Sequence, residues 1–291
     1  MSTLLAAVMA LACAQDAPVE LRWKFEKGRE MLYRFTQKQA FEIQGAAMEQ
    51  AFGFTALLKV EDVAADGLAT VTFTYKAVTA KGSGLLEFEY DSEKDKEPPA
   101  GAPQAAMFAK MVGKSMKMKM KPTGKVVEIL EFEKMVAELL EGEENEAMRE
   151  AMKQMYSGEQ FKSQMQGMAP VLPEQAVKPG DTWKDAFDFK LPMPVSMTFT
   201  SVSTLKALKD GEATIGQDVK IEFKQNPDQP DQALPFEMKD AKGQGTSVFS
   251  VQKGQFLSQK LVMEMKMVVA GNEMPMKMEQ EMKLVEGKKE F

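Results

Sequence analysis

Apolar and polar residues alternate with a period of two over long stretches of this chain. The alternation first runs through residues 21–26, where Leu21, Trp23 and Phe25 are the apolar members, and it returns in residues 31–36, 52–60 and 70–75. In a strand, successive side chains point to opposite faces. We therefore predict that residues 19–91 form antiparallel strands with one face in a core and the other in water.

The order of turn and strand signals occurs twice along the chain. Asp66-Gly67 separates two strand-like runs in the first half, and Asp210-Gly211 does so in the second. Each half then has a glycine pair and a hairpin turn that contains glycine, and these are residues 82–84, 121–125, 243–245 and 252–255. Such internal similarity predicts two related β-meanders.

A helical segment interrupts the first half. The apolar residues of 107–112 suit a short helix after Pro103, which is tolerated in a first turn. Residues 132–140 and 148–155 carry apolar side chains at the spacing of an amphipathic helix, which Gly142 divides into two. A third short helix is predicted within 160–168, and Ser115–Leu130 is predicted to form a hairpin between helices.

Together these patterns predict an α+β, β-rich fold. We expect two strongly curved antiparallel sheets, related by internal duplication, with the helical insert of about 103–168 packed on them. The predicted organisation is a signal peptide in residues 1–14, a first β-meander unit with the insert in 15–170 and a second β-meander unit in 171–291.

The N-terminus indicates export. Residues 4–12 are uninterrupted apolar residues that end in Ala12-Cys13-Ala14, a small-x-small pattern before a cleavage site. We predict that the mature chain begins at Gln15 and is periplasmic or extracellular. A lipid anchor at Cys13 is the alternative. Cys13 is the only cysteine of the chain, so the mature body has no disulfide.

Charge and hydropathy limit the partners. The net charge of −6 gives no electrostatic reason to bind nucleic acid or an anionic membrane. After the first residues, no apolar run approaches the roughly 20 residues that a membrane-spanning helix requires. We expect no nucleic-acid partner and no integral membrane segment.

The chain of 291 residues contains no histidine. This absence excludes nucleophilic dyads that need histidine, histidine-based acid–base catalysis and almost every common zinc, copper(II) or non-haem iron site. Catalysis by a pair of carboxylates stays formally open, since the chain has 43 Asp and Glu residues. No phosphate-binding loop, nucleophile elbow or nucleotide fingerprint is present. We predict that the protein is not an enzyme and has no cofactor or metal.

Methionine is unusually frequent, with 25 residues. It alternates with charged residues in 116–120 and 263–267, and similarly in 274–278, which in strands gathers the methionines on one face. Met118, Met265 and Met276 are therefore the candidate ligand-lining residues. Three interpretations stay open, namely core filling by a flexible side chain, a soft cavity wall for an apolar ligand, and a thioether site for Cu(I).

Four short motifs in a fixed order carry a family resemblance. They are Lys178-Pro179-Gly180-Asp181-Thr182-Trp183, Tyr90-Asp91-Ser92, Val112-Gly113-Lys114 and the turn of residues 122–126. The chain resembles an uncharacterised family of exported bacterial proteins, a domain of unknown function. It is also distantly similar to periplasmic lipoprotein carriers. That second resemblance implies a curved, incompletely closed sheet with helices that holds acyl chains.

We interpret the protein as a non-catalytic binding or scaffolding module of the cell envelope. The alternative is a carrier of an apolar ligand, such as an acyl chain, in a methionine-lined cavity. The partner is then an apolar small molecule or an envelope protein.

Overall fold

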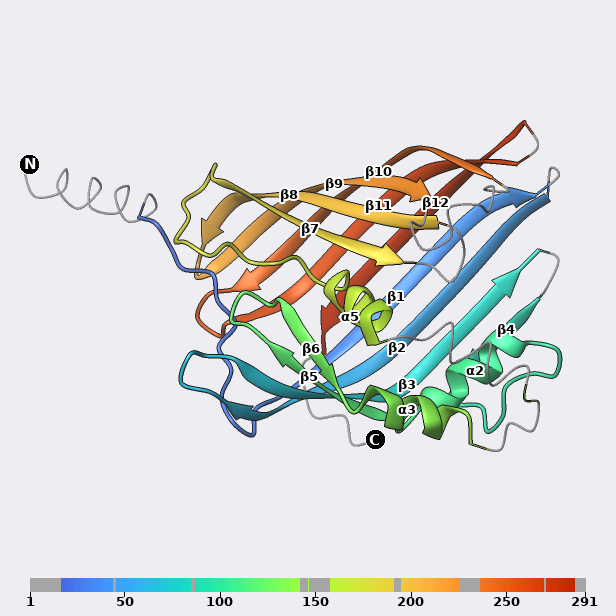
Figure 1. Cartoon of the computed structure of the whole chain (residues 1–291), viewed down its shortest axis with the longest axis horizontal. Helices are drawn as coiled ribbons and strands as arrows, with labels where there is room; N and C mark the ends of the chain where they lie inside the picture. Colours follow the sequence, from blue (N-terminus) through green and yellow to red (C-terminus); the bar gives the residue numbers. More distant parts are fainter. Residues whose placement is uncertain are drawn as a thin grey trace, which may run out of the picture.

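The computed structural model describes residues 17–43, 46–84, 87–141, 146, 158–190, 195–225, 236–269 and 271–285. Within this part of the chain, the strands form one 12-stranded antiparallel sheet with three helices beside it (Figure 1). The strands are β1 Glu30–Ile43, β2 Ala46–Val63, β3 Ala69–Ser83, β4 Phe88–Asp91, β5 Ser115–Met120, β6 Val126–Leu130, β7 Thr182–Lys190, β8 Val195–Lys209, β9 Glu212–Gln225, β10 Glu237–Ser250, β11 Gln255–Val269 and β12 Asn272–Leu284. The helices are α2 Pro103–Met111, α3 Phe132–Leu139 and α5 Gly158–Gln166.

The predicted α+β, β-rich class is confirmed, but the predicted two sheets are one. The strand order is β6-β5-β3-β2-β1-β12-β11-β10-β9-β8-β7, with β4 paired to β3. Each half is a meander, and the first strand of one half pairs with the last strand of the other from Tyr33↔Leu284 to Phe41↔Met276. The sequence pattern predicted strands in both regions, but it did not predict that they pair with each other. The pairing joins residues from nearly opposite ends of the chain.

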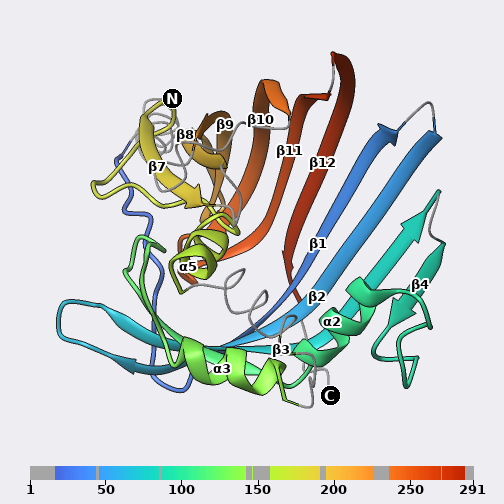
Figure 2. The same ribbon diagram turned by 45° about the vertical axis from the view of Figure 1, so that its right-hand side comes forward.

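The sheet curves until its two end strands, β6 and β7, approach each other, and α5 lies between them (Figure 2). The backbone N–H of Val126 in β6 donates to Oε1 of Gln166 at 2.9 Å. On the other side, Oγ of Ser163 donates to the carbonyl oxygen of Asp188 in β7 at 2.9 Å. Helix α5 thus covers edges that would otherwise present unpaired backbone groups.

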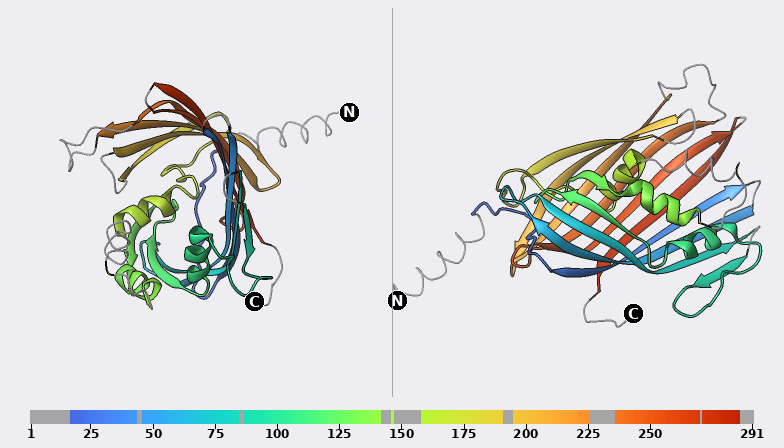
Figure 3. Two further views of the ribbon diagram at one scale, coloured as in Figure 1. Left: turned by 90° about the vertical axis from the view of Figure 1, so that its right-hand side faces the viewer. Right: turned by 60° about the horizontal axis from the view of Figure 1, so that its bottom comes forward.

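The helices pack on the concave side of the sheet (Figure 3). Met135 and Leu139 of α3 and Phe161 of α5 join a large core in which residues from both halves of the chain meet. Helix α2 forms a smaller cluster with β3, in which Ala105 packs near Val78. All three helices begin and end close to their predicted limits. The predicted helical stripe at 148–155 lies outside the described residues, as does the predicted signal peptide.

Tyr33 and Phe256 connect the halves inside the large core. The hydroxyl of Tyr33 donates to the carbonyl oxygen of Phe256 at 2.9 Å, and both side chains are fully buried. Burial raises the pKa of the Tyr33 phenol well above its usual value, an effect that the charge of Arg29 only partly opposes. The two predicted units therefore share one core.

Residues 17–29 cross one end of the sheet. The N–H of Trp23 donates to the carbonyl of Pro122 at 2.8 Å, and the N–H of Lys24 donates to the carbonyl of Gly254 at 3.0 Å. The segment thereby joins the hairpin turns of both halves. The predicted strand around Leu21 is wrong, because apart from the bridge of Val19 to Val177 this extended segment has no ladder in the described structure.

Candidate functional site

Six methionines of β11 and β12 form a patch on the concave side of the sheet. The strands pair Met263 with Met278, Met265 with Met276, and Met267 with Met274. Residues directly opposite in an antiparallel pair have Cβ atoms about 5 Å apart on one face. We call these six residues the methionine face.

The alternation along β11 assigns the methionine face to the inner side. Leu261 and Met263 are buried, whereas their neighbours Lys260 and Glu264 are exposed. Met282, which lies on the same side of β12, belongs to the large core. The side chains of the methionine face therefore point to the side on which the helices lie.

The methionine face is only partly covered. Met263 is 5% exposed, and the other five side chains are half-buried. Met263, Met265 and Met278 belong to a cluster with Phe199, Phe223 and other apolar residues. Every member of that cluster comes from β8 to β12, so among the described residues no helix packs on it.

The candidate methionines separate into two environments. Met265 and Met276 are direct partners on the methionine face. Met118 lies on β5 opposite Val71 and Ile129, is 3% exposed and belongs to the large core. The structure thus brings two of the three candidates together and places the third in the packed interior.

Beside the methionine face, polar side chains cross the concave side from β9 to β1. We call them the polar belt, and they are Gln37, Gln217, Ser247, Gln259 and Gln280. These residues are not among the candidates that the sequence predicted. The alternation along each strand places each of these side chains on the inward face. Only the register of the five strands brings the side chains together.

The inner wall around these residues is uncharged. In the described parts of β1 and β8 to β12, Asp, Glu, Lys and Arg occupy outward positions and none points inward. On the end strand β7, however, Asp185 alternates with Trp183 and Phe187 on the inner side. Burial raises the pKa of the Asp185 carboxyl, and the charge of Lys125 partly opposes that rise.

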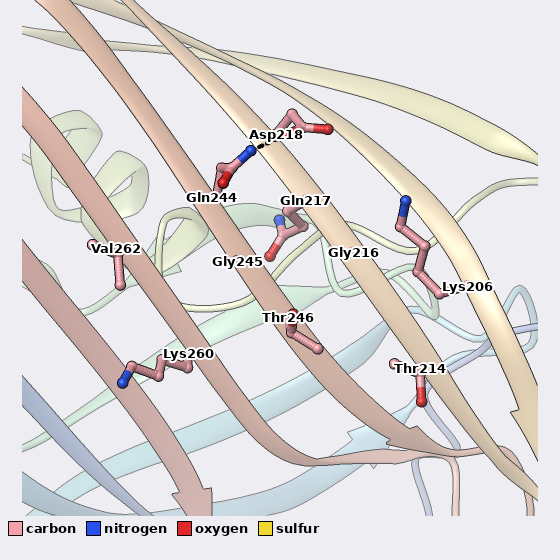
Figure 4. Close-up of a pocket in the computed structure, with 10 residues that line it drawn as sticks. All are labelled: Lys206, Thr214, Gly216, Gln217, Asp218, Gln244, Gly245, Thr246, Lys260 and Val262. Atoms are coloured by element: carbon pink, nitrogen blue, oxygen red, sulfur yellow. Dashed lines mark hydrogen bonds between the residues drawn. The ribbon is translucent and has the colours of Figure 1, made fainter.

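A groove of about 460 Å³ lies on the outer face over β8 to β11 (Figure 4). Its lining includes Lys206, Lys260 and Asp218, and Nε2 of Gln244 donates to Oδ1 of Asp218 at 3.2 Å. Gly216 has no side chain there, and the aliphatic part of Lys206 lies over it. The groove is open and its charges are exposed, as expected of a solvated outer surface.

Within the described residues, no group of three or more Cys, Asp and Glu side chains is arranged to hold a metal ion. The same part of the chain includes no helix with the length and hydropathy to cross a membrane. The inward positions of β1 and β8 to β12, which hold the methionine face and the polar belt, form the uncharged part of the concave side.

The fold and this side define a class of protein, an incompletely closed antiparallel sheet that has helices over one part of its concave side and a methionine face on another. The chain belongs to a family of unknown function, DUF6263, whose family model matches residues 66–255. The match runs from the β2–β3 turn to the first residue of β11, so the methionine face lies beyond it. A comparison with curated proteins found no match.

Proposed function

We propose that this protein is an exported, non-catalytic binding protein that holds the apolar chain of a ligand against the methionine face. The observation that carries the proposal is the half-buried state of Met265, Met276 and their neighbours on a concave, uncharged wall. A continuous apolar patch that is left in contact with water is typical of a binding surface.

Methionine suits such a wall. Its unbranched, polarisable side chain adapts to irregular and variable partners, and methionine-rich surfaces accept several ligands. The distant resemblance to periplasmic lipoprotein carriers supports the same function, because an incompletely closed sheet with helices on its concave side is the arrangement that it implies. An acyl chain is the ligand that this resemblance favours.

The proposal assigns no catalytic role to any residue, since the chain lacks histidine and its single cysteine lies within the predicted signal peptide. Export rests on the apolar run that ends at Ala14. Intact mass of the protein from its native envelope tests this part. A chain that begins at Gln15 agrees with soluble export, a lipidated Cys13 indicates an anchor, and retention of residues 1–14 contradicts export.

Binding is tested with decylpyrene, an alkyl chain on a fluorescent ring that has no polar group. We expect saturable binding to the intact protein, weakened about tenfold by Met265→Gln or Met276→Gln, because each amide places a polar group in the apolar wall. Val262→Gln is the matched control, since Val262 is also half-buried but lies on the outer face of β11.

The proposed function is wrong if decylpyrene does not bind, or if the inner and outer variants weaken binding equally. The Cu(I) interpretation predicts a different outcome. In that case Cu(I) raises the melting temperature of the intact protein, and Met265→Leu abolishes the shift while decylpyrene binding persists.

A further inference from the structure

The polar belt lies at the boundary between the packed and the open parts of the concave side. Ser247 and Gln259 are direct partners, and in the next row Gln217 is opposite Gly245, which is opposite Leu261. Phe256 of the large core lies on one side of the belt and the methionine face lies on the other, whereas Met282 of the large core is the direct partner of Gln259 within the belt. An apolar chain on the methionine face thus ends at the belt.

Three side chains of the polar belt are buried with an unpaired polar atom. Gln217 is 7% exposed, Gln259 is 5% exposed and Ser247 is fully buried. Oε1 of Gln217, Oε1 of Gln259 and Oγ of Ser247 each have no hydrogen-bond partner in the described structure. By contrast, Nε2 of Gln280 donates to Oε1 of Gln37 at 3.1 Å in the same belt.

Glycine shapes the wall beside these atoms. A Cβ on Gly245 would lie 3.4 Å from Oε1 of Gln217 and 3.2 Å from Cδ1 of Leu261. A Cβ on Gly243 would lie 2.9 Å from Cγ of Met263. The two glycines of β10 therefore leave room for the neighbouring side chains, including the amide of Gln217.

Unpaired buried polar atoms are costly. Each costs about 1–3 kcal/mol, and native proteins pair more than about 90% of such groups. Three such atoms lie in two adjacent rows of inward side chains of one sheet. We take this to indicate that a hydrogen-bonding group from outside the chain completes the belt. The glutamine amide and the serine hydroxyl both donate and accept hydrogen bonds.

We propose that the polar belt binds an uncharged hydrogen-bonding group, a hydroxyl or an amide, at the inner end of the ligand. This inference rests on the proposed function, because the same ligand would place its apolar chain on the methionine face. The ligand is then an amphipath that enters with its polar end first.

The absence of charge on the surrounding wall favours an uncharged group at the belt. A carboxylate or an ammonium at the belt would lose its hydration without a counter-charge, because the inward positions of β1 and β8 to β12 carry none in the described residues. Asp185, the inward acid of β7, is separated from Gln217 by strand β8. We therefore expect the belt to bind ligands with an uncharged end group more tightly than ligands with a charged one.

The test measures displacement of decylpyrene from the intact protein by decanol, decanamide, decanoate and decane at neutral pH. We expect decanol and decanamide to bind about tenfold more tightly than decane, as two hydrogen bonds to otherwise unpaired groups allow. Decanoate is expected to bind more weakly than decanol. This ligand series needs no substitution.

Two variants, Gln217→Leu and Gln259→Leu, then test whether the preference for decanol over decane arises at the belt. Each is expected to remove most of the advantage of decanol over decane and to leave decane binding unchanged. Gln244→Leu, on the exposed outer face of β10, is the matched control and should keep the preference. Circular dichroism checks that each variant is folded.

If decane competes as well as decanol, or if Gln217→Leu and Gln259→Leu raise stability while the preference persists, the belt is a structural cluster that ordered water completes, and the inference is wrong. In both cases the chain still binds and the proposed function stands. If no member of the series binds and decylpyrene does not bind either, both the proposed function and the inference are wrong.

Discussion

Gly124 shows how a single missing side chain connects a turn to the core. Its φ of +84° lies in the left-handed region, and a Cβ there would lie only 2.8 Å from Nε1 of Trp23. Gly254, the corresponding glycine of the second half, has a φ of +59°, and a Cβ on it would meet the backbone of Lys24. The glycines of both predicted hairpin turns therefore adopt the left-handed conformation, and residues 17–29 contact both turns.

Gly124→Ala is expected to destabilise the protein by about 2–4 kcal/mol. The left-handed conformation accounts for about 1–2 kcal/mol of this, and displacement of the Trp23 ring accounts for the rest. Gly211→Ala is the control, because Gly211 has a φ of +79° but open space around it. Urea unfolding measures both variants. Equal losses would show that the contact with Trp23 contributes nothing.

Asp185 gives a pH dependence of stability. Because its pKa is raised in the folded protein above the ordinary value of 3.8, the folded protein retains this proton to higher pH than the unfolded chain does. The associated stability is complete below pH 3.8 and is lost as the pH rises through the raised pKa. Asp185→Asn should remove this loss and be more stable than the natural chain near pH 7.

Urea midpoints of both proteins across the acid range check this expectation. Asp188→Asn is the control, since Asp188 is exposed on the outer side of the same strand. A constant difference in midpoint between the natural chain and Asp185→Asn at every pH would contradict the assignment.

At the scale of elements, α5 is the piece that completes the sheet. Within the described residues it forms side-chain hydrogen bonds to both end strands, and Gln166 accepts the bond from Val126 of β6. Gln166→Leu should leave the N–H of Val126 buried without a partner and should cost about 1–3 kcal/mol. Gln164→Leu, on the exposed side of the same helix, should cost less than about 0.5 kcal/mol.

Urea unfolding gives these two free energies, and hydrogen exchange at the Val126 amide reports the contact itself. We expect faster exchange in Gln166→Leu alone. If both variants lose the same stability, α5 does not hold β6 through this side chain.

At the scale of the whole molecule, the two halves should unfold together. They share the pairing of β1 with β12 and one large core, so part of the apolar surface of each unit is buried only against the other unit. The chain contains two tryptophans, Trp23 in the first half and Trp183 in the second. Each serves as the fluorescent reporter of its half.

Trp183→Phe leaves Trp23 as the reporter, and Trp23→Phe leaves Trp183. In each variant, the urea midpoint from tryptophan fluorescence should equal the midpoint from far-UV circular dichroism, since one cooperative transition moves both signals together. Two separate transitions would instead indicate independent domains, and the predicted internal duplication would then correspond to two separately stable units.

The sequence by itself determined the local elements of this protein. Alternation specified the strands and their inward sides, amphipathic spacing specified the helices, and glycine specified turns such as those at Gly124 and Gly254. These features depend on neighbours within a few residues. Alternation alone did not suffice to predict a strand at Leu21 and Trp23. These residues alternate with polar ones, but their segment pairs with no neighbouring strand to form a ladder in the described structure.

Only the tertiary structure decided how deep each inward side chain lies and which distant ones meet. Met118 and Met265 have the same local pattern, yet one is in the packed core and the other is on a half-buried wall, because helices cover only part of the concave side. Gln37 and Gln280 are far apart in the chain and are brought into one belt by the β1–β12 register. Periodicity specifies the face of a strand, whereas depth and long-range register depend on how the whole sheet closes.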